Sequence, residues 1–360
     1  MVRRVRDIWL DIAEALDGAA PAALATILRT SGSAYQREGA KLLYRTPADV
    51  TGAISGGCLE MDVRERCGRV AATGISEVAR YVTGGAESVF GVETGCQGTI
   101  EVLIEPIDAW RNDAARAIVI EVSRRIHRGD SAVVLTVLER DGERVRVADR
   151  GLDDAIDRFP EAKSLAAGGR AGVVPLSAGR EAFVDVVRPA LRLVVFGAGE
   201  DVRPLVAIAA EVGMAVTVVD RRPGLLTRER FPAADALVSP EEAPLEGRPA
   251  VVVMTHEYAE DRGILEKLLG HSSEPAYVGV LGPRDRTRRL IEELAAMAGV
   301  EHRRLEAIRT PAGLDVGARS PAEIALSIVG EILALDRQRT GVPLRDLVGR
   351  GMAETVRRAG

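Results

Sequence analysis

The sequence has few aromatic residues and little net charge, and each shortage excludes a class of partner. Aromatic residues make up 3% of the 360 positions, which is too few for the stacking platforms that bind single-stranded nucleic acid. The formal net charge is −5, so no overall basic field attracts DNA or an anionic membrane surface. We therefore expect neither a nucleic acid nor a membrane as a partner.

Cysteines and long apolar runs are also scarce. The three cysteines, Cys58, Cys67 and Cys96, are odd in number and too widely spaced for a disulfide framework or a CxxC-type zinc site. No apolar run approaches the length of about 18 residues that crosses a membrane. Cys67 falls on the apolar face of a predicted helix, where a place in the core is expected. This cysteine usage predicts a cytoplasmic protein.

The length and the order of the predicted elements favour two domains. Single hydrophobic cores stop growing before about 300 residues, and this chain has 360. In residues 1–188, helices and strands follow no regular alternation, which predicts a mixed α+β domain. In residues 189–360, apolar strands alternate with helices, which predicts a Rossmann-like, doubly wound parallel sheet. The expected fold class is therefore α/β, with the boundary near Arg188 and Pro189.

A glycine-rich loop, Thr51–Glu60, is the most distinctive part of the first domain. Ser55 or Gly56 is predicted to cap the helix that follows, which would place Cys58 in its first turn. The unpaired N–H groups and the helix dipole favour a thiolate there, so Cys58 is a candidate reactive cysteine. A packed core thiol beside a tight turn explains the same spacing, and the sequence leaves both interpretations open. Cys96 lies in a second glycine-containing loop, before a predicted strand.

The second domain begins with a pattern typical of dinucleotide-binding folds. The apolar run Leu191–Phe196 is followed by Gly197 and Gly199, a helix, a second apolar strand and then Asp220. Gly197 would permit a tight turn, and Gly199 would let a phosphate approach the helix N-terminus. Asp220 would accept a hydrogen bond from a ribose hydroxyl. The pattern predicts the fold and a candidate phosphate site.

The same turn departs from the complete dinucleotide fingerprint. Val202 occupies the third small position, and Glu200 and Asp201 place negative charge where a pyrophosphate would bind. An NAD(P)-dependent oxidoreductase is therefore the alternative function, in which the second domain binds the nucleotide and the first binds the substrate.

Further residues stand at predicted strand ends, where ligands of such sheets bind, and they include Arg221, Arg222, Thr255, His256 and Arg284. Arg284 would hold an anionic group through its planar donor fork. The alternative is that Arg284, Arg286, Arg288 and Arg289 form the solvated face of a helix. For His256, the alternative to a functional role is a hydrogen-bonded surface histidine.

Several long motifs occur in a fixed order along the chain. They are Gly32-Ser33, Gly39-Ala40, Gly52–Glu60 and Gly95–Pro106 in the first domain, and Phe196–Gly199, Val219–Arg222, Thr255-His256 with Asp261, Tyr277–Gly282, Pro311–Ala318 and Pro321–Ile328 in the second. On these motifs, the chain resembles the xanthine dehydrogenase accessory protein family (XdhC/CoxI) over nearly its whole length.

The resemblance implies a cytoplasmic maturation factor for molybdenum hydroxylases such as xanthine and carbon monoxide dehydrogenases. Members of the family bind the molybdenum cofactor, a molybdopterin with its metal, and deliver it to the apo-enzyme. They work with a cysteine desulfurase while an oxo ligand of the molybdenum is replaced by sulfur. The resemblance thus favours a cofactor-binding accessory protein over a turnover enzyme, and leaves open which hydroxylase is served. A homodimer is expected from the general prevalence of such assemblies.

The resemblance also implies roles for particular residues. Cys58 would be the metal ligand or a sulfur relay, with Cys96 second, because molybdenum accepts soft sulfur ligands. Whether sulfur passes covalently through Cys58 stays open, as does whether the glycine turn holds a nucleotide, the pterin phosphate or nothing. The residues expected at the cofactor are Ser55, Gly56, Gly57, Cys58, Glu60, Gly197, Gly199, Asp220, His256 and Arg284.

Overall fold

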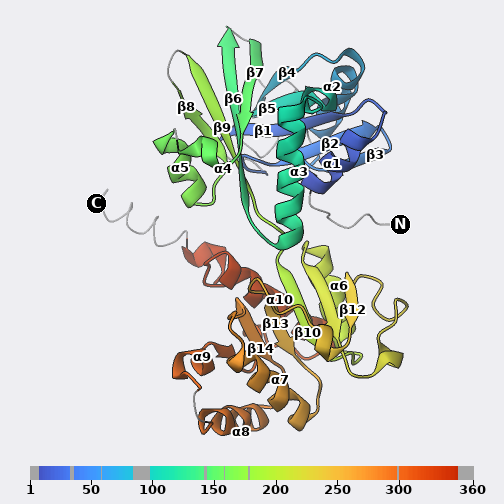
Figure 1. Cartoon of the computed structure of the whole chain (residues 1–360), viewed down its shortest axis with the longest axis vertical. Helices are drawn as coiled ribbons and strands as arrows, with labels where there is room; N and C mark the ends of the chain where they lie inside the picture. Colours follow the sequence, from blue (N-terminus) through green and yellow to red (C-terminus); the bar gives the residue numbers. More distant parts are fainter. Residues whose placement is uncertain are drawn as a thin grey trace. The chain divides into compact units, whose positions relative to one another are not determined.

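A computed structural model describes residues 8–32, 36–57, 59–83, 98–141, 144–157, 159–176, 179–297 and 300–347. The chain divides into two compact units, which meet in the sequence between Pro189 and Ala190 (Figure 1). Each unit has hydrophobic cores of its own. Within the described ranges, no helix is both long enough and apolar enough to cross a membrane.

The first unit contains two antiparallel sheets. The five-stranded sheet has the order β3-β2-β1-β5-β4, and the four-stranded sheet has the order β7-β6-β9-β8. The strands are β1 (Ala23–Gly32), β2 (Lys41–Thr46), β3 (Asp49–Gly52), β4 (Glu77–Thr83), β5 (Gly98–Pro106), β6 (Ala132–Asp141), β7 (Arg144–Gly151), β8 (Gly172–Pro175) and β9 (Arg180–Val187).

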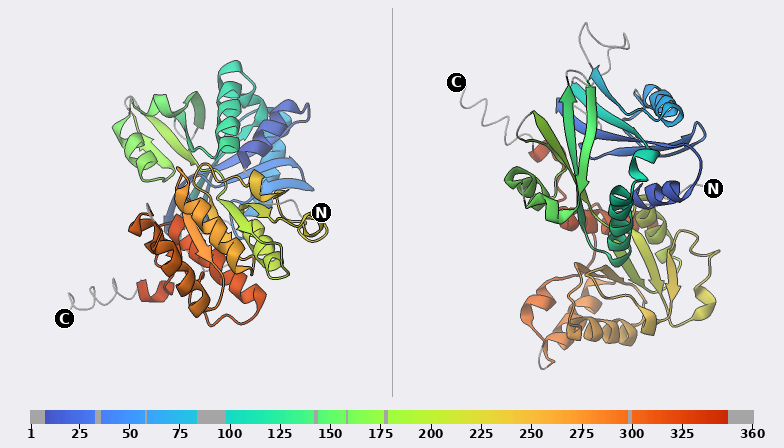
Figure 2. Two further views of the ribbon diagram at one scale, coloured as in Figure 1. Left: turned by 60° about the horizontal axis from the view of Figure 1, so that its bottom comes forward. Right: turned by 45° about the horizontal axis from the view of Figure 1, so that its top comes forward.

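Helices cover these sheets with apolar faces. They are α1 (Ile8–Asp17), α2 (Glu60–Thr73), the 3-10 helix η1 (Ile107–Trp110), α3 (Asp113–Arg128), α4 (Asp153–Ile156) and α5 (Pro160–Ala167). Val63, Cys67 and Val70 on one side of α2 pack against one face of the five-stranded sheet. Helices α1 and α3 lie side by side and share a core with strands of both sheets (Figure 2). The predicted core place of Cys67 is confirmed by its exposure of 0%.

Two buried ion pairs join the two sheets. Lys41 of β2 lies 2.7 Å from Asp185 of β9, and Arg150 of β7 pairs with Glu105 of β5. Burial raises the pKa of Glu105, and the attraction of Arg150 opposes that rise. Charges in such an interior are tolerated because each has a partner.

The second unit is a six-stranded parallel sheet with the order β12-β11-β10-β13-β14-β15. Numbered from the first strand of the unit, this order is three-two-one-four-five-six, the order of the Rossmann fold. The strands are β10 (Arg192–Phe196), β11 (Ala215–Val219), β12 (Ala236–Val238), β13 (Ala250–Val253), β14 (Tyr277–Val280) and β15 (Ile308–Arg309). The predicted Rossmann-like sheet is confirmed.

The two faces of this sheet are covered by different helices, as Figure 1 shows. Leu193 and Val195 of β10 belong to the core that α6 and α10 complete. The alternate residues Val194 and Phe196 belong to the core formed with α7, α8 and α9. The helices of the unit are α6 (Val202–Glu211), η2 (Pro223–Leu225), η3 (Pro240–Glu242), α7 (Tyr258–Gly270), α8 (Arg284–Ala295), α9 (His302–Glu306) and α10 (Pro321–Asp336). Because the strands are buried on both faces, they read as continuous apolar runs.

Some short elements differ from the sequence-based expectation. The Ala- and Gly-rich composition of residues 164–172 predicts a polar connection, but α5 runs through Ala167. This helix has one buried residue, Ala162, so it leaves almost no apolar period in the sequence. The polar residues that start at Arg29 predict the end of the apolar strand that begins at Ala23. Strand β1 instead continues to Gly32, because it stays paired with β5 across a bulge.

Candidate functional site

The glycine-rich loop between β3 and α2 is held from inside by Ser55 and Glu60. Glu60 Oε1 accepts hydrogen bonds from the N–H groups of Ile54 (2.8 Å) and Ser55 (2.7 Å). Ser55 Oγ accepts from the N–H groups of Gly57 and Leu59, both at 3.2 Å. Ser55 is 5% exposed. These two predicted cofactor residues therefore shape the loop, whatever else they bind.

The glycines of this loop have different roles. Gly52 has φ +82°, and a Cβ at this position would lie 2.2 Å from the carbonyl oxygen of Lys41, so a larger residue would displace the backbone. Gly57 has φ +122°, and a Cβ there would meet no atom within 4 Å. Gly56 and Gly57 are exposed. The loop thus presents open backbone to solvent at its tip.

The two candidate reactive cysteines, Cys58 and Cys96, lie outside the described residues. Helix α2 begins at Glu60 with Leu59 at its N-cap. The prediction that Ser55 or Gly56 caps this helix is therefore wrong, because the hydrogen bonds that Ser55 Oγ accepts close a turn before the helix begins. Burial raises the pKa of the Cys67 thiol to about 12, which makes that thiol unreactive.

The predicted tight turn between β10 and α6 is present in the second unit. Gly197 has φ +118°, and a Cβ there would lie 2.5 Å from the carbonyl oxygen of Met254. Its N–H donates to the carbonyl oxygen of Val219 at 2.8 Å. The turn is thereby packed between the ends of β11 and β13, at the edge of the sheet where Rossmann ligands bind.

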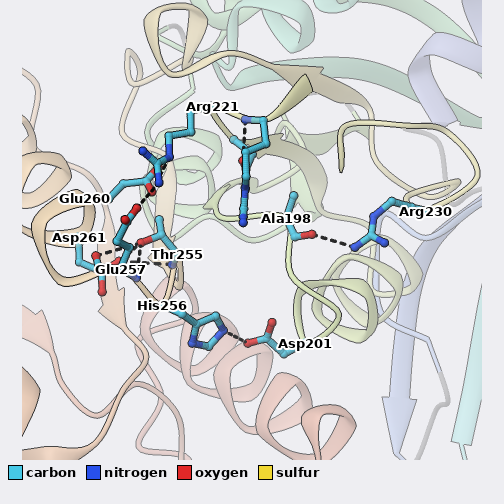
Figure 3. A network of polar contacts seen from close by, with 11 residues as sticks. Ala198, Asp201, Arg221, Arg230, Thr255, His256, Glu257, Glu260 and Asp261 are labelled. Atoms are coloured by element: carbon cyan, nitrogen blue, oxygen red, sulfur yellow. Dashed lines mark hydrogen bonds and ion pairs between the residues drawn. The ribbon is translucent and has the colours of Figure 1, made fainter. Parts of the chain in front are cut away.

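Helix α6 begins without a side-chain cap. Its N-cap residue, Asp201, makes no capping hydrogen bond, because its carboxylate accepts from His256 Nε2 at 2.7 Å (Figure 3). In the first turn of the helix, Val202 donates its N–H to the carbonyl oxygen of Gly199 at 3.3 Å, and Pro204 has no N–H. The start of α6 therefore attracts an anion mainly through the positive end of the helix dipole.

His256 takes the left-handed conformation, with φ +63°, which is uncommon for a residue other than glycine. This backbone brings its ring beside the glycine turn, where a Cβ at Gly199 would lie 3.9 Å from His256 Cδ2. The side chain is 57% exposed. His256 is thus a hydrogen-bonded surface histidine, and it borders the candidate phosphate site.

Asp220 follows β11 as predicted, but its carboxylate is occupied by Arg222. Oδ1 accepts from the Arg222 N–H at 2.8 Å and from Nε at 2.9 Å, and Oδ2 accepts from Nη2 at 2.8 Å. Burial alone would raise the pKa of Asp220, but the hydrogen bonds from Arg222 and from the Ala198 N–H outweigh it and lower the pKa. The residue expected to bind a ribose is therefore satisfied within the chain.

Glu200 does not carry the free negative charge that the sequence suggested. It pairs with Arg203 at 2.9 Å and with Arg230 at 2.7 Å, and hydrogen bonds from these two arginines lower its pKa. Arg230 also donates to the carbonyl oxygen of Ala198 at 2.9 Å (Figure 3). The predicted repulsion of an anion by Glu200 is therefore reduced.

A second network lies after β13 and includes one arginine from the predicted solvated face of α8. Asp261, with 0% exposure, accepts from Thr255 Oγ1 at 2.5 Å and from Arg286 Nη2 at 2.5 Å. The solvated-face interpretation is therefore wrong for Arg286, whereas Arg288 and Arg289 are exposed.

Arg284 is placed apart from the glycine turn. It is exposed at the first residue of α8, and among the described residues it forms no ion pair. It lines a hollow of about 620 Å³ together with Arg288 and Thr310. Strand β13 lies between β10 and β14 in the sheet, so the glycine turn and Arg284 share an edge but not a pocket. In the described part of the chain, no group of three or more His, Cys, Asp or Glu residues could hold a metal ion.

The ion pairs of three arginines of the site were not predicted, although the sequence places Arg221 and Arg222 at the strand end. Arg222 stands next to the Asp220 motif, and its spacing of two residues from the acid was a usable signal for an Asx-type turn. Arg230 lies in the irregular segment between β11 and β12 and has no local signal. Arg221 pairs with Glu257 and Glu260 (Figure 3), which only the strand order brings close.

Comparison with known proteins covers nearly the whole chain. The XdhC Rossmann domain model matches residues 193–332, and the XdhC and CoxI family model matches residues 15–82. A Bacillus subtilis (strain 168) protein, named as a probable subunit of xanthine dehydrogenase, is 31% identical over 331 residues, which are 89% of this chain and 94% of that protein.

Two further relatives also match over most of their length. The molybdenum cofactor insertion chaperone PaoD of Escherichia coli (strain K12) is 23% identical over 329 residues, 89% of this chain and 86% of PaoD. A crystal structure described as a xanthine dehydrogenase from Bacillus halodurans is 28% identical, with a TM-score of 0.72 over 92% of this chain and 96% of that chain. The chain belongs to the XdhC and CoxI family.

Proposed function

We propose that this protein is a maturation factor that carries the molybdenum cofactor to a molybdenum hydroxylase of the xanthine or carbon monoxide dehydrogenase type. The observation that carries the proposal is that relatives matching nearly the full length are named for xanthine dehydrogenase or for molybdenum cofactor insertion. In this role the cofactor is cargo, and the protein holds it, supports its sulfuration by a cysteine desulfurase and releases it to the apo-enzyme. A cytoplasmic homodimer is part of the proposal.

The described residues fit the phosphate end of such a cargo. A phosphate is favoured by a positive potential and by pairing of the adjacent carboxylates. The positive end of the α6 dipole lies at this turn, Glu200 beside it is paired with two arginines, and the Asp201 carboxylate accepts a hydrogen bond from His256. Gly197, Gly199 and His256 border this turn, so we assign the anionic end of the cargo to it, with Arg284 as a further cation at the same edge.

The loop that carries Cys58 suits the metal end of the cargo. Ser55 and Glu60 fix the loop, and its glycine tip is open to solvent. Glu60 Oε2 accepts no hydrogen bond from any described residue, but it lies 4.0 Å from Arg64 Nε, so we assign Glu60 to holding the loop that borders the cargo. We assign Cys58 as the thiolate nearest the metal and Cys96 as the second candidate, because soft sulfur ligands suit molybdenum.

The first experiment is anoxic incubation of the purified protein with molybdenum cofactor, followed by gel filtration and measurement of bound molybdenum and pterin. Wild type should retain both in equal amounts, and Cys58→Ala should lose molybdenum. A matched control is Cys67→Ser, which changes a cysteine of the core and should retain the cargo if it stays folded by circular dichroism. Retention by Cys58→Ala would leave the carrier role and remove Cys58 from it. No retention by folded wild type would refute the carrier role.

A second measurement separates a carrier from a permanent component of the enzyme, since one relative is named as an enzyme subunit. Loaded protein is mixed with apo-hydroxylase, and the products are separated by size. A carrier should leave molybdenum on the hydroxylase and elute without it, whereas a permanent component would stay bound in a fixed ratio. The NAD(P)-dependent oxidoreductase is the other alternative, and saturable NADH binding by wild type would favour it.

A further inference from the structure

The ribose position of the Rossmann fold is filled in this protein by its own side chain. In dinucleotide-binding members of this fold, an acidic residue after the second strand accepts hydrogen bonds from ribose hydroxyls. Asp220 has that place after β11, and both of its carboxylate oxygens accept from Arg222 at 2.8–2.9 Å. The side chain of Asp220 is 2% exposed, and that of Arg222 is 52% exposed. The guanidinium therefore covers the carboxylate from the solvent side.

Displacement of Arg222 by a ribose would cost free energy. The fork of Arg222 makes two charge-assisted hydrogen bonds in the bidentate geometry that is strongest for a carboxylate. A bound ribose would put two neutral hydroxyls in the place of the guanidinium. The carboxylate of Asp220, which is almost completely removed from water, would then lack a charged partner, and a buried carboxylate without such a partner is costly. Ribose binding is therefore disfavoured as long as Arg222 is present.

A nucleotide with a 2′-phosphate is disfavoured as well. An arginine near this acid accommodates the 2′-phosphate in NADP-binding proteins. Here the Nε and Nη2 donors of Arg222 already bind Asp220, whose lowered pKa keeps it ionised. A dianionic phosphate would have to compete with this carboxylate for the same guanidinium and would be repelled by it.

A second arginine crosses the path of a dinucleotide, but more weakly. Arg221, after β11, pairs with Glu257 and Glu260, after β13 (Figure 3), and β10 lies between these two strands in the sheet. The bridge thus passes over the crevice in which a dinucleotide extends from one half of the sheet to the other. Arg221 is 57% exposed and Glu257 52%, so solvent screens this pair and a ligand opens it easily.

We propose that Arg222 is a specificity-determining residue that closes the ribose position, so that the second unit rejects adenine dinucleotides. The inference rests on the proposed function in one respect, that the ligand of the protein is the cargo and not NAD(P). It adds the residue by which nicotinamide dinucleotides are excluded.

The test is fluorescence titration of the full chain with NADH and NADPH. Wild type should show no saturable binding of either up to about 1 mM, the weak limit of specific binding. Arg222→Ala should expose the carboxylate and bind NADH at least about tenfold more tightly than wild type, since one hydrogen bond to a charged group is worth a factor of that order. Asp220→Asn combined with Arg222→Ala should lose that gain. Arg221→Ala, the neighbouring exposed arginine, is the matched control and should show none.

Two results would overturn the inference. One is wild type that binds NADH or NADPH as tightly as Arg222→Ala. The other is Arg222→Ala and Arg222→Gln that both keep native circular dichroism and gain no NADH affinity. Cofactor retention is measured separately on the same preparations. Failure of wild type to retain the cofactor, together with a gain of NADH binding in Arg222→Ala, would refute the carrier role alone. Retention of the cofactor by wild type that also binds NADH as tightly as Arg222→Ala would refute the role of Arg222 alone.

Discussion

The buried carboxylate of Asp261 predicts a large difference between two arginines of one helix. Arg286 lies 2.5 Å from Asp261, whose side chain is 0% exposed. Arg289 lies on the same helix and pairs with Glu293 at 3.0 Å, with 73% of its side chain exposed. Replacing either arginine by methionine removes the same charge and keeps a long side chain, so the two variants differ mainly in the partner left behind.

The expected magnitudes follow from burial. Arg286→Met leaves a buried charge without its partner, which costs about 3–5 kcal/mol of the free energy of unfolding. Thr255 still donates to Asp261 at 2.5 Å, so we expect about 3 kcal/mol, the lower end of that range. Arg289→Met should cost about 0–1 kcal/mol, because solvent screens an exposed pair. Adding Asp261→Asn to Arg286→Met should recover part of the loss, since no buried charge is then left.

Urea unfolding followed by two signals measures these costs. Both tryptophans, Trp9 and Trp110, lie in the first unit, so their fluorescence reports that unit, whereas far-ultraviolet circular dichroism reports both. The unfolding of the second unit is therefore the circular dichroism transition that occurs without a fluorescence change. Arg286→Met should move this transition to lower urea concentration. A shift for Arg286→Met no larger than that for Arg289→Met would refute the argument from burial.

Three further predictions concern the loop and the turn. Asp220→Asn should lower the free energy of unfolding at pH 7 by about 1–3 kcal/mol. Because folding lowers the pKa of Asp220, its stabilisation is present above the unfolded pKa of about 3.9 and is lost as pH falls through the folded value. Urea titrations across pH should show the difference from wild type vanishing in acid, and a constant difference would contradict the linkage. Gly197→Ala should cost at least about 2 kcal/mol, because the added Cβ would lie 2.5 Å from a carbonyl oxygen at φ +118°. Gly263→Ala in α7, where a Cβ meets nothing within 4 Å, should stabilise by up to about 1 kcal/mol, and equal melting temperatures for these two variants would be the contrary result. Ser55→Ala should cost about 1 kcal/mol and speed amide hydrogen exchange at the two N–H groups bound to Ser55 Oγ, and unchanged exchange would show that the hydroxyl does not hold the loop.

The fold of the second unit could be predicted because its signals are local. The apolar run Ala215–Val219 predicts a strand, and β11 has those bounds, since a strand buried on both faces is a continuous apolar run between polar ends. The spacing of Ser320 and Glu323 predicts a capping box, which is present. Strand β15, with two residues, and helix α5, with one buried residue, were missed because elements so short leave no periodic pattern.

The candidate site could be predicted only in part, because most of its side-chain pairs are not local in the sequence. Gly197 and Asp220 belong to a local strand-turn-helix-strand pattern and were found from it. The pairs that decide the chemistry join distant parts of the chain, such as Asp201 with His256 and Glu200 with Arg230. No local spacing encodes them, because they form only when the strand order brings the carboxyl ends together.

The uncapped start of α6 has a consequence for the energetics of the folded protein. A helix that lacks an N-cap side chain is less stable by about 1 kcal/mol, and Asp201 does not supply the cap because it is bound to His256. A ligand that binds only the folded state stabilises it in proportion to the logarithm of its concentration over its dissociation constant. We therefore expect the melting temperature to rise in the presence of phosphate esters that bind at the first turn of α6. Thermal denaturation then becomes a screen, in which compounds can be ranked by the delay of unfolding before the natural cargo is isolated.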